Sequence, residues 1–110
     1  MSVSFRSTKA EDVKTGDVLM QVDEGKRRTE FYYYRAYTVF VGELVDEVRD
    51  GQGNLLGKRR HDGVEIFWQP FDPNDKPFNM RYHRLAQLDI ATSKVESLSD
   101  LILSEDHDEE

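Results

Sequence analysis

The sequence predicts a mainly β protein, a small bent antiparallel barrel or meander of about five to six strands with one C-terminal helix. Its 110 residues suffice for one domain only. Most of its twelve aromatic residues lie between Phe31 and Tyr82, in extended runs that alternate with Gly-, Asp- and Pro-containing turns. We therefore expect a β domain over residues 1–92, a helix over residues 93–104 and a disordered acidic tail over residues 105–110.

The first predicted strand runs from Asp17 to Val22. Gly16 can supply the turn before it, and Val18, Met20 and Val22 then alternate with their neighbours. The run Val13-Lys-Thr-Gly-Asp-Val18 is similar to the entry into the first strand of SH3-like small barrels. That resemblance implies an SH3-like arrangement of the strands.

Residues 29–41 form the stretch with the highest β propensity, and aromatic side chains occur at both alternating sets of positions. We expect this strand to be covered on both faces, by the barrel interior on one side and by a helix, loop or partner on the other. Gly42 predicts a bend or bulge directly after it.

Two Asp-Gly pairs predict turns in the next segment. Asp50-Gly-Gln-Gly-Asn54 is a strong hairpin signal, because its residues favour left-handed backbone conformations. The second pair, Asp62-Gly63, precedes an alternating run from Val64 to Gln69. Residues 43–69 are therefore expected to form a three-stranded meander.

The last third of the chain begins with a loop, since three prolines fall between Pro70 and Pro77. Residues 78–91 favour a short helical turn followed by a closing strand. Ser93 and Glu96 have the spacing of a capping box, which predicts a helix from about Lys94 to Leu103.

Charge is segregated along the chain. All fifteen Lys and Arg residues lie at or before Lys94, whereas six of the 22 acidic residues fall in the last eleven positions. Nearly the whole formal net charge of −7 therefore belongs to the end of the sequence. Such an apolar-acidic segment is typical of a contact element or of a solubilising tail.

Several classes of protein are not favoured by the composition. Cysteine is absent, so no disulfide or thiolate metal site can form. No apolar run approaches the ~20 residues that span a bilayer, and no signal peptide is evident. We expect a cytoplasmic protein, or one in the host cytoplasm if the source is viral.

Neither catalytic nor metal-binding residues are predicted, and no cofactor is expected. Gly51-x-Gly53 lacks the third glycine and the helix of a dinucleotide-binding loop. The three histidines, His61, His83 and His107, are far apart in the sequence and form no ligand motif. A non-enzymatic protein is therefore the expectation.

The favoured function is a protein-interaction or regulatory module, such as a small phage or bacterial inhibitor or adaptor, that contacts another protein through its C-terminal segment. The same segment could instead pack on its own domain. The predicted partner-binding residues are Leu98, Leu101, Ile102, Leu103, Glu105, Asp106, Asp108, Glu109 and Glu110.

The alternative is a small barrel that binds single-stranded nucleic acid. The tetrapeptide Gly-Lys-Arg-Arg occurs twice, and exposed tyrosines beside these basic loops would stack on bases. A third hypothesis joins both features, with the acidic tail covering the basic loops or acting as a nucleic-acid mimic toward another protein. The residues predicted for nucleic-acid binding are Lys26, Arg27, Arg28, Tyr32, Tyr34, Arg35, Lys58, Arg59 and Arg60.

Overall fold

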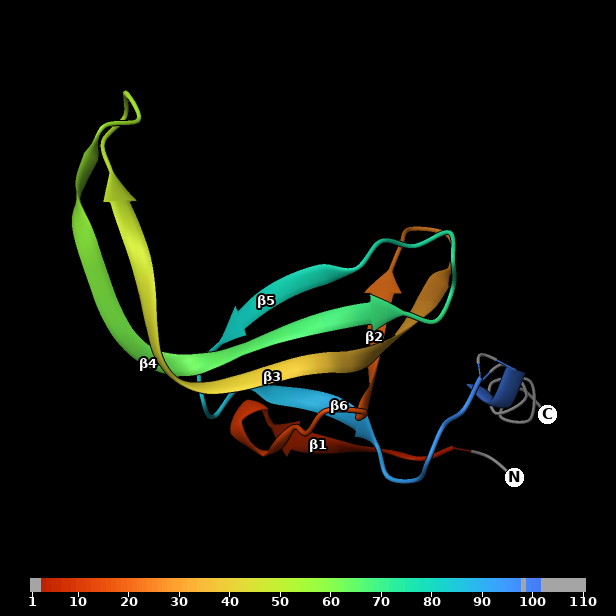
Figure 1. Cartoon of the computed structure of the whole chain (residues 1–110). Coiled ribbons are helices and arrows are strands. Elements are labelled where there is room, and N and C mark those ends of the chain that lie inside the picture. Colours follow the sequence, from red (N-terminus) through yellow and green to blue (C-terminus); the bar gives the residue numbers. More distant parts are fainter. Residues whose placement is uncertain (1–2, 98, 102–110) are drawn as a thin grey trace.

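The computed structural model describes residues 3–97 and 99–101, and it consists of one antiparallel sheet of six strands in the order β1-β6-β2-β3-β4-β5 (Figure 1). The fold is mainly β, as predicted. A single 3-10 turn, η1 (Ala10–Asp12), follows the first strand. The strands are β1 (Phe5–Lys9), β2 (Val18–Glu24), β3 (Thr29–Arg49), β4 (Leu55–Pro70), β5 (Phe78–Tyr82) and β6 (Gln87–Ala91).

The long strands β3 and β4 form the backbone of the sheet. Their pairing extends from Tyr34 opposite Pro70 to Arg49 opposite Leu55, and it contains bulges after Ala36 and Val48. β2 covers only the first part of β3, up to the pair of Val18 with Arg35, and β5 covers only Val64–Trp68 of β4. The far halves of β3 and β4 therefore continue beyond the rest of the sheet as a two-stranded ribbon (Figure 1).

The main core lies where η1, β2 and β6 pack against β3 and β4 (Figure 1). Alternate residues of β4 point into it, because successive side chains of a strand face opposite sides of the sheet. Trp68 is fully buried, and its indole Nε1 donates a hydrogen bond to the Tyr82 hydroxyl at 2.8 Å. The other buried members are Ala10, Val13, Leu19, Tyr34, Ala36, Val64, Ile66 and Ile90.

A second, smaller core covers the opposite face of β2 and β3. Tyr33 and Val18 pack there against Val95 and Leu101 from the C-terminal segment. The Arg35 guanidinium holds the same segment, since its Nη2 donates to the Val95 carbonyl at 2.7 Å. The prediction that residues 29–41 are covered on both faces is thus confirmed at Tyr33 and Tyr34 but is wrong at Phe31, Tyr37 and Phe40, which are exposed.

The predicted barrel is not closed. β1 and β5 stand at the two ends of the strand order, so the described part of the chain forms an open, curled sheet. The turn before β2 nevertheless has the predicted form, with Gly16 at a φ of +96°. An SH3-like closure would require the two end strands to pair.

The predicted three-stranded meander over residues 43–69 is wrong. Asp50–Asn54 is a hairpin turn, as predicted, but β4 runs without interruption through Asp62 and Gly63. Gly63 instead pairs with Gly42, at the point where the ribbon bends. This Asp-Gly pair therefore lies within one continuous strand. The two residue types alone do not distinguish such a position from a turn.

Two other expectations need correction, and one strand was not predicted. Residues 78–82 form strand β5 rather than a helical turn, although the closing strand after them is confirmed as β6. Residues 92–97 are not helical, so Ser93 does not cap a helix, and only residues 99–101 of the predicted helix are described as helical. β1 was not predicted. None of the helical segments in the described residues is long and apolar enough to cross a membrane.

Candidate protein-contact surface on the β3–β4 arm

The ribbon of residues 43–62, here called the arm, projects from one end of the sheet (Figure 1). Gly42 and Gly63, which pair directly, stand at its base. A Cβ atom on Gly63 would lie 2.9 Å from the Tyr82 carbonyl oxygen and 3.0 Å from Leu44 Cδ1. Such distances leave no room for a larger side chain, so glycine allows β4 to bend here while it stays close to β5.

The turn at the end of the arm is held by Asp50. Its Oδ1 accepts hydrogen bonds from the backbone N–H groups of Gln52 and Asn54, both at 2.9 Å. These bonds, with that of Asn54 first, lower the pKa of the Asp50 carboxyl. Gly53 supplies the left-handed conformation with a φ of +87°. The local sequence thus determines the turn.

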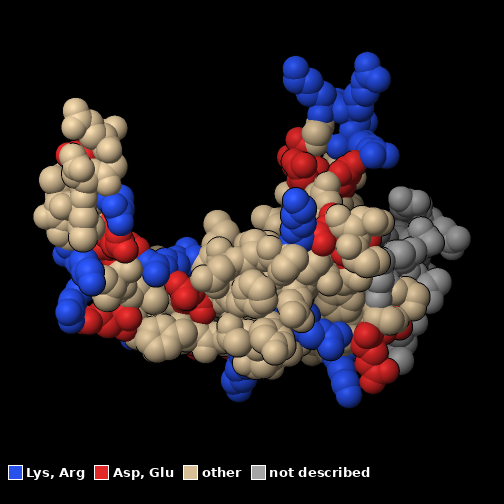
Figure 2. Space-filling view, turned by 45° about the horizontal axis from the view of Figure 1, so that its top comes forward, with Lys and Arg blue, Asp and Glu red and all other residues tan. Residues whose placement is uncertain are grey.

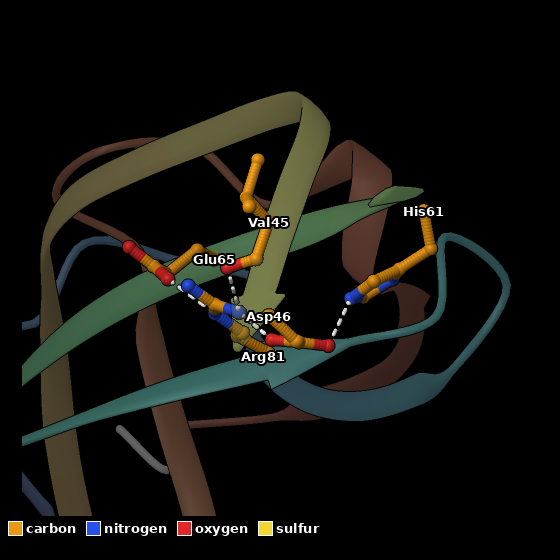
Figure 3. A network of polar contacts seen from close by, with 5 residues as sticks. All are labelled: Val45, Asp46, His61, Glu65 and Arg81. Atoms are coloured by element: carbon orange, nitrogen blue, oxygen red, sulfur yellow. Dashed lines mark hydrogen bonds and ion pairs between the residues drawn. The ribbon is translucent and has the colours of Figure 1, made fainter. Parts of the chain in front are cut away.

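Arg81 of β5 fixes the inner side of the bend (Figure 3). Its Nε donates to Glu65 Oε1 at 2.7 Å, and its Nη1 contacts both the Val45 carbonyl, at 3.2 Å, and the Asp46 carboxylate. His61 Nε2 lies 2.8 Å from the second oxygen of Asp46. One guanidinium therefore joins the body of the sheet to the arm, and its hydrogen bond holds the pKa of Glu65 below the ordinary value.

Arg84 fixes the other side. Its Nη2 donates to Asp62 Oδ1 at 2.7 Å, and its Nε donates to the second oxygen of the same carboxylate. This bidentate contact is the main cause of the lowered pKa of Asp62. Asp62 and His61 are neighbours in one strand and so point to opposite faces. The two arginines consequently hold the base of the arm from both faces.

The arm exposes apolar side chains from its base, at Val45, to its outer end, at Leu55 and Leu56. Leu55 and Leu56 are 52% and 66% exposed, and Val45 and Val48 are each 40% exposed. Figure 2 shows that the end of the arm carries few charged side chains. A two-stranded ribbon has no core of its own and is marginally stable in isolation. These side chains are therefore open to contact from outside the described chain.

Sequence reasoning missed this surface. Asp62-Gly63 suggested a turn, and Leu55 and Leu56 were assigned to a short strand within a compact meander. The two leucines did carry a signal, since two adjacent apolar residues directly after a hairpin turn cannot both face the same side of a sheet.

The structure does not bring the two Gly-Lys-Arg-Arg motifs together. Lys26, Arg27 and Arg28 lie at the turn between β2 and β3, whereas Lys58–Arg60 lie on the arm, and these regions stand at opposite ends of the face in Figure 2. Arg28 pairs with Glu30 at 2.6 Å and Arg60 with Glu43 at 3.1 Å. The remaining four bases, Lys26, Arg27, Lys58 and Arg59, form no ion pair with any described residue.

The two tyrosines predicted to stack on bases, Tyr32 and Tyr34, make contacts within their own domain instead. Tyr34 is buried in the main core, where its ring meets Phe78 edge to face. Tyr32 packs against the same core and donates its hydroxyl hydrogen to Glu30, which raises the pKa of Tyr32 to about 12. Arg35 binds Val95 and lies over the Phe71 ring. The exposed aromatic residues of β3 are instead Phe31, Tyr37 and Phe40.

The described part of the predicted partner-binding segment faces inward. Leu101 is fully buried in the second core, so the alternative in which the segment packs on its own domain accounts for this residue. Leu98, Ile102, Leu103, Glu105, Asp106, Asp108, Glu109 and Glu110 lie outside the described residues.

No arrangement of polar residues in the described part of the chain indicates a catalytic or metal centre. A hollow of about 420 Å³ lies beside Arg35, with Thr15, Asp17, Thr92 and Lys94 in its wall. No three His, Asp or Glu side chains gather as metal ligands among residues 3–97 and 99–101.

Comparison of the chain with family models, with curated proteins and with solved structures found no match.

Proposed function

We propose that this chain is a non-enzymatic protein-interaction module, and that the β3–β4 arm is its contact element. The observation that carries the proposal is the exposure of four apolar residues, Val45, Val48, Leu55 and Leu56, on a ribbon whose base is fixed. Exposed apolar groups of this kind mark contact sites in soluble proteins.

The fixed base supports the same function. Binding costs less free energy when the contact element already has its bound conformation. Arg81 and Arg84 link the arm to β5 and to the following loop, and the glycine pair sets the bend. The arm is therefore preorganised to present its outer residues at one angle.

The experiment that tests the proposal places a photo-activated cross-linking amino acid at Leu56. The control carries the same group at Leu85, which is also exposed but lies in the loop after β5, away from the outer part of the arm. We expect cross-links to protein from position 56 and few from position 85. Equal cross-linking at both positions, or none at position 56, would overturn the proposal.

Nucleic-acid binding is the second candidate, favoured by the unpaired Lys26 and Arg27 at the β2–β3 turn. Phosphate contacts would give an affinity that falls steeply with salt. Fluorescence polarisation with single-stranded oligonucleotides should then show weaker binding for the Lys26→Glu/Arg27→Glu variant. An affinity that changes neither with the salt concentration nor with this substitution would exclude nucleic-acid binding through Lys26 and Arg27.

A further inference from the structure

The outer edge of β4 is an open strand edge. β5 pairs with β4 only over Val64–Trp68, and no described strand pairs with the same edge of residues 55–60. Backbone N–H and C=O groups on such an edge can pair with an extended segment of another chain. This edge is therefore a template for an added strand.

The side chains along this edge define what would fit. Leu55 and Leu56 are exposed and apolar. Lys58 and Arg59 follow them and lie across from Glu47 and Asp46 of β3, but those carboxylates form ion pairs with Arg49 and Arg81 instead. Arg60 is already paired with Glu43. An added strand would thus need two apolar residues and then, after one residue, two acidic ones.

The end of this sequence has that pattern. When Ile102 is placed beside Leu55 in parallel orientation, Leu103 meets Leu56, and Glu105 and Asp106 meet Lys58 and Arg59. Ser104 then lies beside Gly57, where no side chain opposes it, and His107 beside the paired Arg60. Strands from separate chains can pair in parallel because they need no crossover connection.

The match points to a second copy of the chain rather than to the same copy. The helical residues 99–101 and the arm lie at opposite ends of a molecule that is 55 Å long (Figure 1). Residues 102–110 can span at most about 32 Å when fully extended. The acidic segment of one copy is therefore too short to reach its own arm, whereas it can reach the arm of another copy.

We propose that residues 102–107 of one copy add as a parallel strand to the open β4 edge of a second copy, with reciprocal exchange closing a dimer. This inference rests on the proposed function of the arm and names its partner. Carboxylates meet bases at two adjacent positions, so the contact weakens as salt screens them.

The turn between β2 and β3 is the less suitable acceptor. Lys26 and Arg27 could attract the same acidic residues, but β2 and β3 pair with each other up to Glu24 and Thr29. The turn thus offers charge alone, without an open edge or neighbouring leucines.

The test is a charge exchange in the full chain, followed by sedimentation velocity over a concentration series. We expect the wild type to dimerise. Lys58→Glu/Arg59→Glu and Glu105→Lys/Asp106→Lys should each weaken the dimer roughly tenfold or more. An equimolar mixture of the two variants should recover it, because each arm then meets a complementary tail. The matched control, Lys26→Glu/Arg27→Glu, should dimerise like the wild type.

The outcomes that overturn this inference differ from those that overturn the proposed function. A wild type that stays monomeric, a mixture that does not associate, or loss of dimer only in the Lys26/Arg27 variant would each refute the tail–arm contact. Cross-linking from Leu56 to a different protein would in those cases still support the arm as a contact element. If the arm contacted no protein at all, position 56 would give no cross-links to protein and the wild type would sediment as a monomer.

Discussion

Gly42 and Gly63 lie directly opposite each other at the base of the arm. A Cβ on Gly42 would lie 3.1 Å from the end of the Phe40 ring, and one on Gly63 would meet the backbone of β5. The ring can move, whereas the β5 backbone is held by its own pairing. Gly63 is therefore the more constrained partner of this pair.

We expect Gly63→Ala to destabilise the fold by about 1–3 kcal/mol, because the added methyl group forces β4 and β5 apart. Urea unfolding monitored by tryptophan fluorescence would measure the loss. Gly57→Ala is the matched control on the same strand, since nothing lies within 4 Å of its Cβ position. Equal effects at the two positions would show that the close approach does not constrain the bend.

Arg81→Leu should loosen the arm more than it lowers the global stability. Exposed ion pairs contribute about 1 kcal/mol or less, yet Arg81 joins Glu65 to Asp46 and Val45 across the bend. Amide hydrogen exchange should therefore speed up over residues 43–49 and change little in β2. Arg59→Leu removes a base that has no described partner, and it should leave the exchange rates unchanged at a protein concentration low enough to keep the chain monomeric.

Acid should release the base of the arm. The folded-state pKa values of Glu65 and Asp62 lie below their ordinary values of 4.5 and 3.8, mainly because Arg81 and Arg84 donate to them. A lowered folded-state pKa contributes stability that is present above the unfolded pKa and is lost as pH falls through the folded value. The urea concentration at the midpoint of unfolding should therefore decrease as the pH is lowered below about 5. The double variant Arg81→Leu/Arg84→Leu should show a flatter profile, and an unchanged profile would contradict this linkage.

Tyr82→Phe should destabilise the main core by about 1–3 kcal/mol, because it leaves the buried Trp68 indole N–H without an acceptor. Calorimetry or urea unfolding would measure the change. The same substitution at the exposed Tyr37 serves as the control and should be nearly neutral. A neutral Tyr82→Phe would mean that the indole finds another acceptor.

Leu101→Ala should cost about 2–5 kcal/mol if the C-terminal segment packs on its own domain, as its full burial indicates. Leu56→Ala, at an exposed position of the arm, should change the stability of the monomer by less than about 0.5 kcal/mol. Thermal unfolding of both variants at low protein concentration makes the comparison. Similar small effects would place Leu101 outside the core.

Local signals in the sequence predicted the parts of the fold that are determined locally. The turn at Asp50–Asn54, the β propensity of residues 29–41 and the bend at Gly42 depend on neighbouring residues. Asp62-Gly63 was misjudged because glycine also occurs where two backbones approach closely, as Gly63 does with β5, and the sequence does not distinguish that requirement from a turn. β1 was missed because its pairing depends on β6, about eighty residues later. The arm surface could not be recognised before the two long strands were known to run unbroken.

The pairing of β1 with β6 also has a consequence for synthesis on the ribosome. Ser7 lies opposite Asp89, so β1 can join the sheet only after β6, the last described strand, has been synthesised. The β3–β4 hairpin, closed by a five-residue turn, can form as soon as Pro70 has emerged. During that interval the nascent chain exposes Trp68 and its neighbours, because β6 supplies Ile90, part of their cover. A pause between the synthesis of Pro70 and that of β6 would therefore prolong the exposure of this apolar surface.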